Sequence, residues 1–245
     1  MRVKLTVAYD GTDYCGWQVQ PNGITIEEVL NKALSELFEE DIKVIGASRT
    51  DSGVHAKGNV AIFDTDSEMD ASRISFALNS RLPRDIVVVD STQVPDDWHP
   101  HLADSIKTYE YRILNTTFDD PLRFRYTHHY HYDLDVDAMN EAAKHLIGTH
   151  DFTSFSSVKA QVKTFTRTLT EVSVNRNGDE IIIRCVGSGF LYNMVRIITG
   201  TLIRVGEGRI SPDDITGIIE AGDREKAGPT APAKGLTLIG IEYHL

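Results

Sequence analysis

Apolar and polar side chains alternate at the start of the chain, from Val3 to Tyr9, which is the pattern of a half-buried β-strand. The segment Thr25-Ile26-Glu27-Glu28 is a capping box, and the apolar residues after it recur at helical spacing as far as Leu37. The other elements predicted in the first half of the chain are a helix over 71–80 and strands over 60–63, 85–89 and 107–114.

A similar order of elements follows the polar loop at residues 116–121. Asp135 is positioned to cap a helix whose apolar side carries Met139, Ala142, Ala143, Leu146 and Ile147. An Asn-Gly pair within residues 175–179 predicts a hairpin between strands at 169–174 and 180–186. The last predicted elements are a helix from Phe190 to about Val205, a helix capped by Ser211, and a strand over 236–243.

Direct connections between strands outnumber regular β-α-β alternation in this order of elements. We therefore predict an α+β fold with a largely antiparallel sheet and helices on one side of it. The two halves have similar element order, although no sequence repeat relates them. The loop that separates them predicts two domains, residues 1–115 and residues 116–245.

The composition is that of an ordinary globular protein, since 41% of the 245 residues are hydrophobic and 25% are charged. These values exclude disordered, collagen-like and low-complexity chains. No apolar run approaches the roughly 18 residues of a membrane-spanning helix, and the alternating first residues do not predict a signal peptide. Cys15 and Cys185 lie far apart in the sequence, which argues against a disulfide framework and favours a reducing, cytoplasmic location.

The chain is acidic, with 25 Lys and Arg residues against 36 Asp and Glu residues and a formal net charge of −11. Such a balance argues at first against a nucleic-acid partner. However, net charge does not show how charges are distributed, and phosphate binding needs only a local basic stripe. The acidic total therefore leaves a nucleic-acid substrate open.

The densest chemical signal is the segment Gly46-Ala47-Ser48-Arg49-Thr50-Asp51-Ser52-Gly53-Val54-His55-Ala56. In one interpretation it is a polar turn, in which Asp51 binds nearby backbone amides and Gly53 adopts a positive φ. In the other, Asp51 is a functional carboxylate at the end of a strand. Arg49, two residues away on the same face of an extended backbone, would then keep the carboxylate ionised.

Two later segments combine aromatic and cationic side chains. Alternation in Lys107-Thr108-Tyr109-Glu110-Tyr111-Arg112-Ile113 puts Tyr109 and Tyr111 on one face. We expect Tyr111 to pack in the core, and one tyrosine of the pair is a candidate for stacking on a base. Arg196 interrupts the apolar helix predicted from Phe190, so it either extends to solvent or pairs with a buried acid such as Asp51.

Histidines gather at two places, His99 with His101 and His128 with His129 and His131. Two histidines spaced by one residue on a strand point the same way and are able to bind zinc. No His-Glu-x-x-His motif or fixed acidic partner accompanies them, so we predict no metal site. A metallohydrolase built on the second cluster is a rival hypothesis that elemental analysis would decide.

Six segments together resemble the tRNA pseudouridine synthase A family, which acts on the tRNA anticodon stem-loop. They are Tyr9-Asp10-Gly11-Thr12, Gly16-Trp17-Gln18-Val19-Gln20-Pro21, Arg49-Thr50-Asp51-Ser52-Gly53-Val54-His55-Ala56, Lys107-Thr108-Tyr109-Glu110-Tyr111-Arg112, Phe190-Leu191-Tyr192-Asn193-Met194-Val195-Arg196 and Ala227-Gly228-Pro229-Thr230-Ala231-Pro232. The resemblance implies two similar α/β halves that share a mixed sheet with a central cleft, and a homodimer. It also implies isomerisation of uridine to pseudouridine at tRNA positions 38, 39 and 40.

The resemblance implies roles for individual residues. Asp51 matches the catalytic aspartate, and Tyr109 matches the residue that contacts the target base. Arg196 matches the ion-pair partner of the aspartate, and Arg49 matches a residue that helps to hold the flipped nucleotide. The half formed by residues 1–115 would thus carry the catalytic loop, and the other half would complete the cleft.

The sequence departs from the family pattern at a few positions. Ser48, Ser52 and Asn59 stand where Gly, Ala and Gln are more usual. Ser156 stands where the family commonly has an arginine, so one RNA contact is in doubt, and Lys159 or Lys163 is a candidate to replace it.

The implied reaction breaks an N–C glycosidic bond, turns the uracil and forms a C–C bond, so it requires neither a redox cofactor nor a nucleotide. A carboxylate would start it by attacking the sugar or the base, or by removing a sugar proton, and the sequence leaves these routes open. The base must first leave its stack. A non-catalytic RNA-binding module is the second rival hypothesis, because such a module would bind RNA without using Asp51 as a reactive group.

The polyanionic substrate requires local positive charge. We expect some of the following basic residues to line one cleft, with acidic residues on the opposite surface: Arg81, Arg84, Arg112, Arg123, Arg125, Lys159, Lys163 and Arg167.

Overall fold

The structure, a computed structural model, describes residues 1–157 and 162–243 and divides into two compact units. Unit 1 comprises Met1–Ser105 together with Thr237–Leu245, and unit 2 comprises Ile106–Leu236. Both units combine helices with mixed, mostly antiparallel strand pairing, which confirms the predicted α+β class. The domain boundary expected between residues 115 and 116 stays a prediction.

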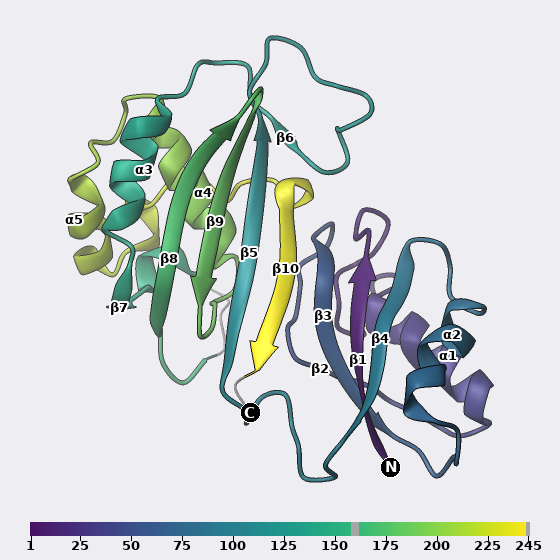
Figure 1. Ribbon diagram of the computed structural model, residues 1–245. Helices are drawn as coiled ribbons and strands as arrows, with labels where there is room; N and C mark the ends of the chain where they lie inside the picture. The colour runs from purple at the N-terminus through teal and green to yellow at the C-terminus, as the bar shows by residue number, and fades with distance from the viewer. Residues whose placement is uncertain (158–161, 244–245) are drawn as a thin grey trace. The chain divides into compact units, whose positions relative to one another are not determined.

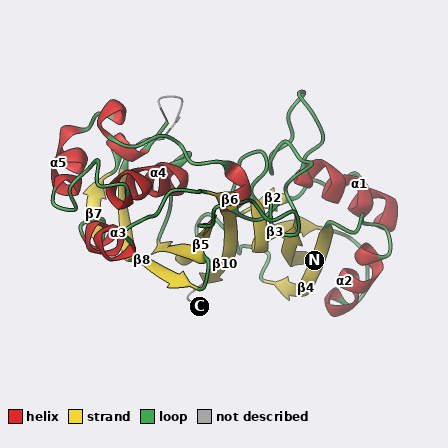
Figure 2. Cartoon of the chain, turned by 90° about the horizontal axis from the view of Figure 1, so that it is seen from above, coloured by secondary structure: helices red, strands yellow, loops and turns green. Residues whose placement is uncertain are grey.

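Unit 1 pairs its strands in the order β4-β1-β3-β10, with the short β2 on β3 (Figure 1). The pairing is antiparallel except for β10, which runs parallel to β3. Helices α1 and α2 lie on the same side of these strands (Figure 2). The elements are β1 (Arg2–Tyr9), α1 (Ile26–Phe38), β2 (Ile45–Gly46), β3 (His55–Asp64), α2 (Ala71–Asn79), β4 (Ile86–Val94) and β10 (Leu236–Tyr243).

Simple sequence signals account for these elements. Val3, Leu5 and Val7 of β1 are fully buried while the residues between them are half-buried, as the alternation predicts. Thr25 caps α1 by accepting a hydrogen bond from the Glu28 amide at 3.3 Å, which confirms the first half of the capping box.

Unit 2 pairs its strands in the order β5-β9-β8-β7, with the short β6 running parallel to β5. One face of this sheet is apolar, because Tyr109 lies opposite Cys185 and Tyr111 lies opposite Ile183. The helix α4 is buried over most of its length and packs against α3. The elements are β5 (Ser105–Leu114), β6 (His128–His129), α3 (Val136–Lys144), β7 (Gly148–Asp151), β8 (Thr166–Asn177), β9 (Glu180–Gly187), α4 (Met194–Gly206) and α5 (Asp214–Ala221), with 3₁₀ turns at Thr153–Phe155, Arg224–Lys226 and Ala233–Gly235.

Three predicted helix boundaries are wrong. The fourth helix begins at Met194 and not at Phe190, because Asn193 has φ 62° and the left-handed conformation cannot continue a right-handed helix. The last helix begins at Asp214 with Asp213 as its cap, two residues beyond the expected cap at Ser211. The third helix ends at Lys144, so its expected apolar member Ile147 is 41% exposed.

None of the helices within residues 1–157 and 162–243 combines the length and apolarity that crossing a membrane requires.

Substitution of Gly200 tests how closely α4 approaches the neighbouring chain. A Cβ at Gly200 would overlap the carbonyl oxygen of Pro229, which belongs to the loop that crosses the helix. Because the atoms that this Cβ would meet are backbone atoms of Pro229, they cannot move aside as a flexible side chain would. We therefore expect Gly200→Ala to lower the free energy of unfolding by about 3 kcal/mol, measured by urea denaturation. Gly217 in α5 has no atom within 4 Å of its Cβ position, so Gly217→Ala should be neutral or raise stability by up to about 1 kcal/mol. Equal effects at both glycines would contradict the close approach.

The stability of the protein should depend on the titration of His128. Burial, reinforced by the charge of Lys234, lowers the pKa of His128 from 6.5 to about 4. Between these two values the unfolded chain binds a proton that the folded chain excludes, so stability falls as the pH drops from about 6.5 to about 4. Between pH 6.5 and pH 4, the free energy of unfolding of His128→Phe should therefore fall by about 1 kcal/mol less than that of the wild type. This difference is smaller than the pKa shift alone would give, because His128 is partly exposed to solvent. The control is His131→Phe, which makes the same replacement at an exposed position and is compared with His128→Phe by urea denaturation over the same pH range.

Candidate active-site residues

Asp51 lies in a loop between β2 and β3, which we call the aspartate loop and define as Ala47–Val54. The loop is a turn rather than the end of an extended strand, since the Val54 amide donates to the Asp51 carbonyl at 3.1 Å and Gly53 has φ 78°. The Asp51 side chain is half-buried and that of Arg49 is exposed. Residues 49–51 belong to neither a helix nor a strand, and the expectation that Arg49 and Asp51 share one face stays a prediction.

The segment Asp10–Trp17 holds the aspartate loop in place through hydrogen bonds. The Trp17 amide donates to the Thr50 carbonyl at 3.1 Å, immediately before Asp51. Immediately after it, the Ser52 hydroxyl and the Gly53 amide both donate to the carbonyl of Tyr14, at 3.1 and 3.3 Å. Asp51 is thus bracketed on both sides by fixed backbone groups.

Two glycines let this segment approach the loop closely. Gly16 has φ 84°, and a Cβ there would lie 2.5 Å from the Thr50 carbonyl oxygen. A Cβ at Gly11 would overlap the carbonyl oxygen of Val54. These contacts explain why glycines occupy both positions in the first two family-like segments.

Buried polar side chains complete the support of the loop. The Tyr9 hydroxyl lies 2.8 Å from the Thr50 hydroxyl, and the fully buried Asn59 donates to the Ser48 carbonyl at 2.9 Å. Asn59, one of the departures from the family pattern, therefore has a structural contact of its own. The buried His55 accepts a hydrogen bond from the Gly11 amide through Nδ1 at 3.0 Å, which ties the start of β3 to the same segment.

Unit 2 holds Tyr109 and Tyr111 on the apolar face of β5. Tyr109 is 7% exposed, and its ring packs edge to face against Phe190 with centroids 5.0 Å apart. Tyr111 is fully buried, which confirms its expected place in the core, and its hydroxyl donates to the Pro232 carbonyl at 2.7 Å. Burial raises the pKa of the Tyr111 hydroxyl well above its usual value.

The guanidinium of Arg196 is half-buried and held by several groups of unit 2. Its Nε donates to the Ala231 carbonyl at 2.7 Å, and its Nη1 donates to Asn193 Oδ1 at 2.8 Å. Asn193 is fixed in turn, because its Nδ2 donates to the Ser157 hydroxyl at 2.7 Å. The alternative in which Arg196 simply extends to solvent does not describe these contacts.

Sequence reasoning did not identify Asn193 or the Ala231 carbonyl as groups that orient Arg196. A signal was present, because both residues lie in segments that resemble the family, although neither residue was given a role. Asp51 belongs to unit 1 and Arg196 to unit 2, and their pairing stays a prediction.

Two of the expected phosphate-binding residues form ion pairs with acidic side chains. Arg112 pairs with Glu110 at 3.2 Å and with Glu180 at 3.0 Å. Arg123 contacts three carboxylates, the closest being Asp120 at 2.7 Å. Their positive charge is locally balanced, so these two arginines are weaker candidates for RNA contacts.

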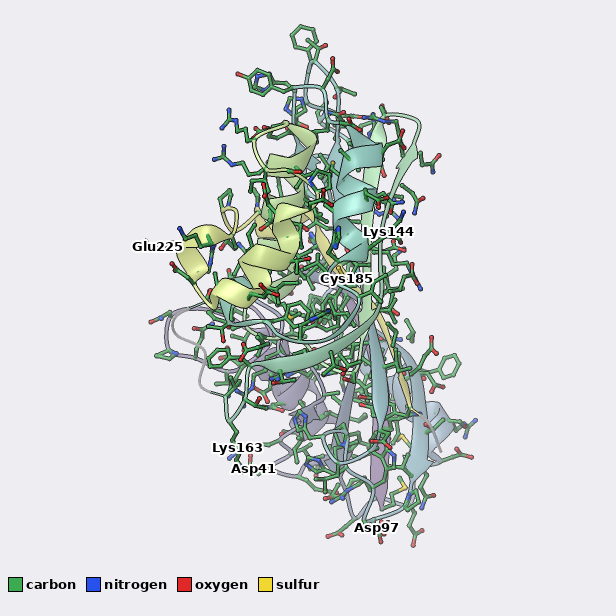
Figure 3. The ribbon with its side chains drawn as sticks, turned by 90° about the vertical axis from the view of Figure 1, so that its left-hand side faces the viewer. Asp41, Asp97, Lys144, Lys163, Cys185 and Glu225 are labelled. Atoms are coloured by element: carbon green, nitrogen blue, oxygen red, sulfur yellow. The ribbon has the colours of Figure 1, made fainter. Side chains whose placement is uncertain are left out.

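The region around the departure at Ser156 is only partly described. Ser156 itself is 2% exposed, whereas Lys163, one candidate to replace the missing arginine, is exposed (Figure 3). Lys159, the other candidate, lies outside the described residues.

The histidine clusters do not form metal sites in the part of the chain that the structure describes. No three His, Cys, Asp or Glu side chains there come together in a group that could hold a metal ion. The His129 ring contacts the Thr116 carbonyl at 2.8 Å, and His99 Nδ1 accepts from the His101 amide at 3.2 Å. Both clusters thus have local structural contacts.

Known proteins are similar in sequence to almost the whole length of this chain. A family model described as tRNA pseudouridine synthase matches residues 5–101 and 142–244. The chain is 47% identical over 242 residues to the tRNA pseudouridine synthase A of Brevibacillus brevis, covering 99% of both chains. It is 49% identical over 242 residues to that of Exiguobacterium sp., covering 99% of this chain and 98% of the relative. The match to the protein of the same name from Clostridium acetobutylicum is 46% over 241 residues, covering 98% of this chain and 99% of the relative.

This degree of identity over nearly the full length, together with the family model, is sufficient to assign the family. The chain belongs to the tRNA pseudouridine synthase A family and is an isomerase.

Proposed function

We propose that this protein isomerises uridine to pseudouridine at positions 38, 39 and 40 of the tRNA anticodon stem-loop, with Asp51 as the catalytic nucleophile or base. The observation that carries the proposal is the aspartate loop, which presents a half-buried carboxylate between two backbone positions fixed by hydrogen bonds. A group held in this way needs little rearrangement before it reacts. We also propose that the protein forms a homodimer and is located in the cytoplasm.

The reaction balances without any added group. The N1–C1′ bond of uridine breaks and a C5–C1′ bond forms, while C5 loses its proton to water and N1 gains one. Asp51 would act by attacking the sugar or the base, or by removing a sugar proton, and all three routes require it to be ionised. Release of the C5 hydrogen is common to all three routes and therefore provides a direct assay.

The other proposed residues assist this carboxylate. Arg196 would pair with Asp51 and keep it ionised, and its anchoring by Ala231 and Asn193 supports a fixed orientation. Tyr109 would contact the flipped base, since its ring is already held by Phe190. Arg49 would hold the flipped nucleotide, and its exposure supports contact with a large ligand.

Replacement of Asp51 tests the proposal directly. With tRNA transcripts tritiated at C5 of uridine, the wild type should release tritium without added metal or nucleotide. Asp51→Asn should slow this release by a factor on the order of 1,000 or more while the Kd for tRNA changes by less than about threefold, because the amide cannot act as a nucleophile or base.

A matched control is Asp41→Asn, which changes an acid that is 86% exposed (Figure 3) and should leave the rate unchanged. Normal turnover by Asp51→Asn would exclude the proposed role. Binding of tRNA by the wild type without tritium release or pseudouridine at positions 38 to 40 would instead identify an RNA-binding module.

Pairing of Arg196 with Asp51 should appear both in rate and in stability. Arg196→Gln should slow tritium release by about 100-fold or more, whereas Arg204→Gln, on the same helix, should not. In a double-mutant cycle on the free energy of unfolding, Asp51→Asn and Arg196→Gln should couple by about 1 kcal/mol or more. Additive effects of the two substitutions on stability would show that they do not interact.

A further inference from the structure

Two positively charged residues lie at one end of the unit 2 sheet, where three strands begin or end together (Figure 1). Lys107 is near the start of β5, and Arg167 is near the start of β8. The last residue of β9, Gly187, pairs with Lys107 on one side and with Leu169 on the other. The register therefore brings the two cations to the same edge, with only β9 between their strands.

Lys107 lies on the same face of the sheet as Tyr109, because residues two apart on a strand point the same way. The residue opposite Lys107 is Gly187, which has no side chain. A Cβ at Gly187 would lie 2.5 Å from the Thr168 carbonyl oxygen and 2.7 Å from Leu169 Cδ2. In the register, Lys107 therefore lies opposite a glycine of β9, and the Leu169 side chain covers this glycine.

Arg167 is held against the turn that follows β9. Its Nη1 donates to the carbonyls of Thr164 and Thr166, at 2.9 and 2.6 Å. The Cβ position of Gly189 lies 3.6 Å from Arg167 Cδ and 3.7 Å from its Nε. The next residue in this turn is Phe190, whose ring contacts that of Tyr109. The Arg167 side chain thus contacts the residue immediately before Phe190, close to the aromatic pair that includes the proposed base-contacting Tyr109.

Electrostatics favours an anion at this edge. Burial lowers the pKa of Lys107 to about 8, and the nearby charge of Arg167 contributes in the same direction. Burial also lowers the pKa of Arg167. A bound anion would offset the repulsion between these two like charges.

We propose that Lys107 and Arg167 form a phosphodiester-binding subsite beside Tyr109, which holds the RNA backbone next to the target nucleotide. The proposal rests on the proposed function, since RNA supplies the phosphodiester. It adds Lys107, which the sequence analysis did not consider as an RNA contact, and gives Arg167 a specific partner.

The test measures binding of an anticodon stem-loop RNA as a function of NaCl concentration. Lys107→Met and Arg167→Met should each raise the Kd about tenfold near 0.1 M salt and reduce the slope of log K against log salt by about 1, as loss of one phosphate contact requires. Lys107→Arg should restore both quantities, because it keeps the charge. Lys144→Met is the matched control, since Lys144 is an exposed residue of α3 paired with Glu141 (Figure 3).

The outcomes separate the alternatives. Unchanged affinity in Lys107→Met, or weaker binding with the wild-type salt slope, would overturn the subsite and leave a structural role for the lysine. If Lys107→Met fails to fold, the salt slope of Arg167→Met decides by the same criteria. A wild type that neither binds the RNA nor forms pseudouridine would overturn the proposed function and the subsite with it, whereas an active wild type with insensitive variants would overturn the subsite alone.

Discussion

The position of Asp51 depends on close backbone packing between two short segments that are distant in sequence. Gly16 lies against the carbonyl of Thr50, and Gly11 lies against the carbonyl of Val54. Side chains at either glycine would push the segments apart and break the hydrogen bonds to Thr50, Ser52 and Gly53. The chemistry assigned to one carboxylate thus relies on two residues that have no functional group.

This dependence explains what the sequence could predict. Strands β1 and β10 follow from local alternation, and their bounds agree closely with the expected ranges. The Asp51 segment stands out through its glycines and charges and through its resemblance to a family. The contacts that hold it come from residues 9–17, about 35–40 positions earlier, and no local pattern encodes such pairing.

The start of α4 shows the same limit at a smaller scale. The apolar stripe after Phe190 has helical spacing, so periodicity alone extends the helix to that residue. Instead Asn193 turns the chain into a left-handed conformation, which frees Phe190 to contact Tyr109 and lets the Asn193 side chain bind Arg196. Tertiary contacts of the site therefore override the local preference for helix.

The acidic composition also has a structural counterpart. On the face of unit 2 opposite Tyr109, Arg112 and Arg184 both contact Glu110, and Arg184 also contacts Glu171. These pairs between half-buried residues balance charge locally. Net charge therefore says little about which surface of the protein could meet a polyanion.

Strand β10 determines when unit 1 can be completed during synthesis of the chain. It comes from the end of the chain, yet it belongs to unit 1 and pairs with β3 at His55 and Ala56, directly after the aspartate loop. During synthesis on the ribosome, unit 2 is complete before this strand emerges. The segment that carries Asp51 therefore gains this neighbouring strand only after the whole of unit 2 has been synthesised, so a nascent chain contains the aspartate long before β10 can pair beside it.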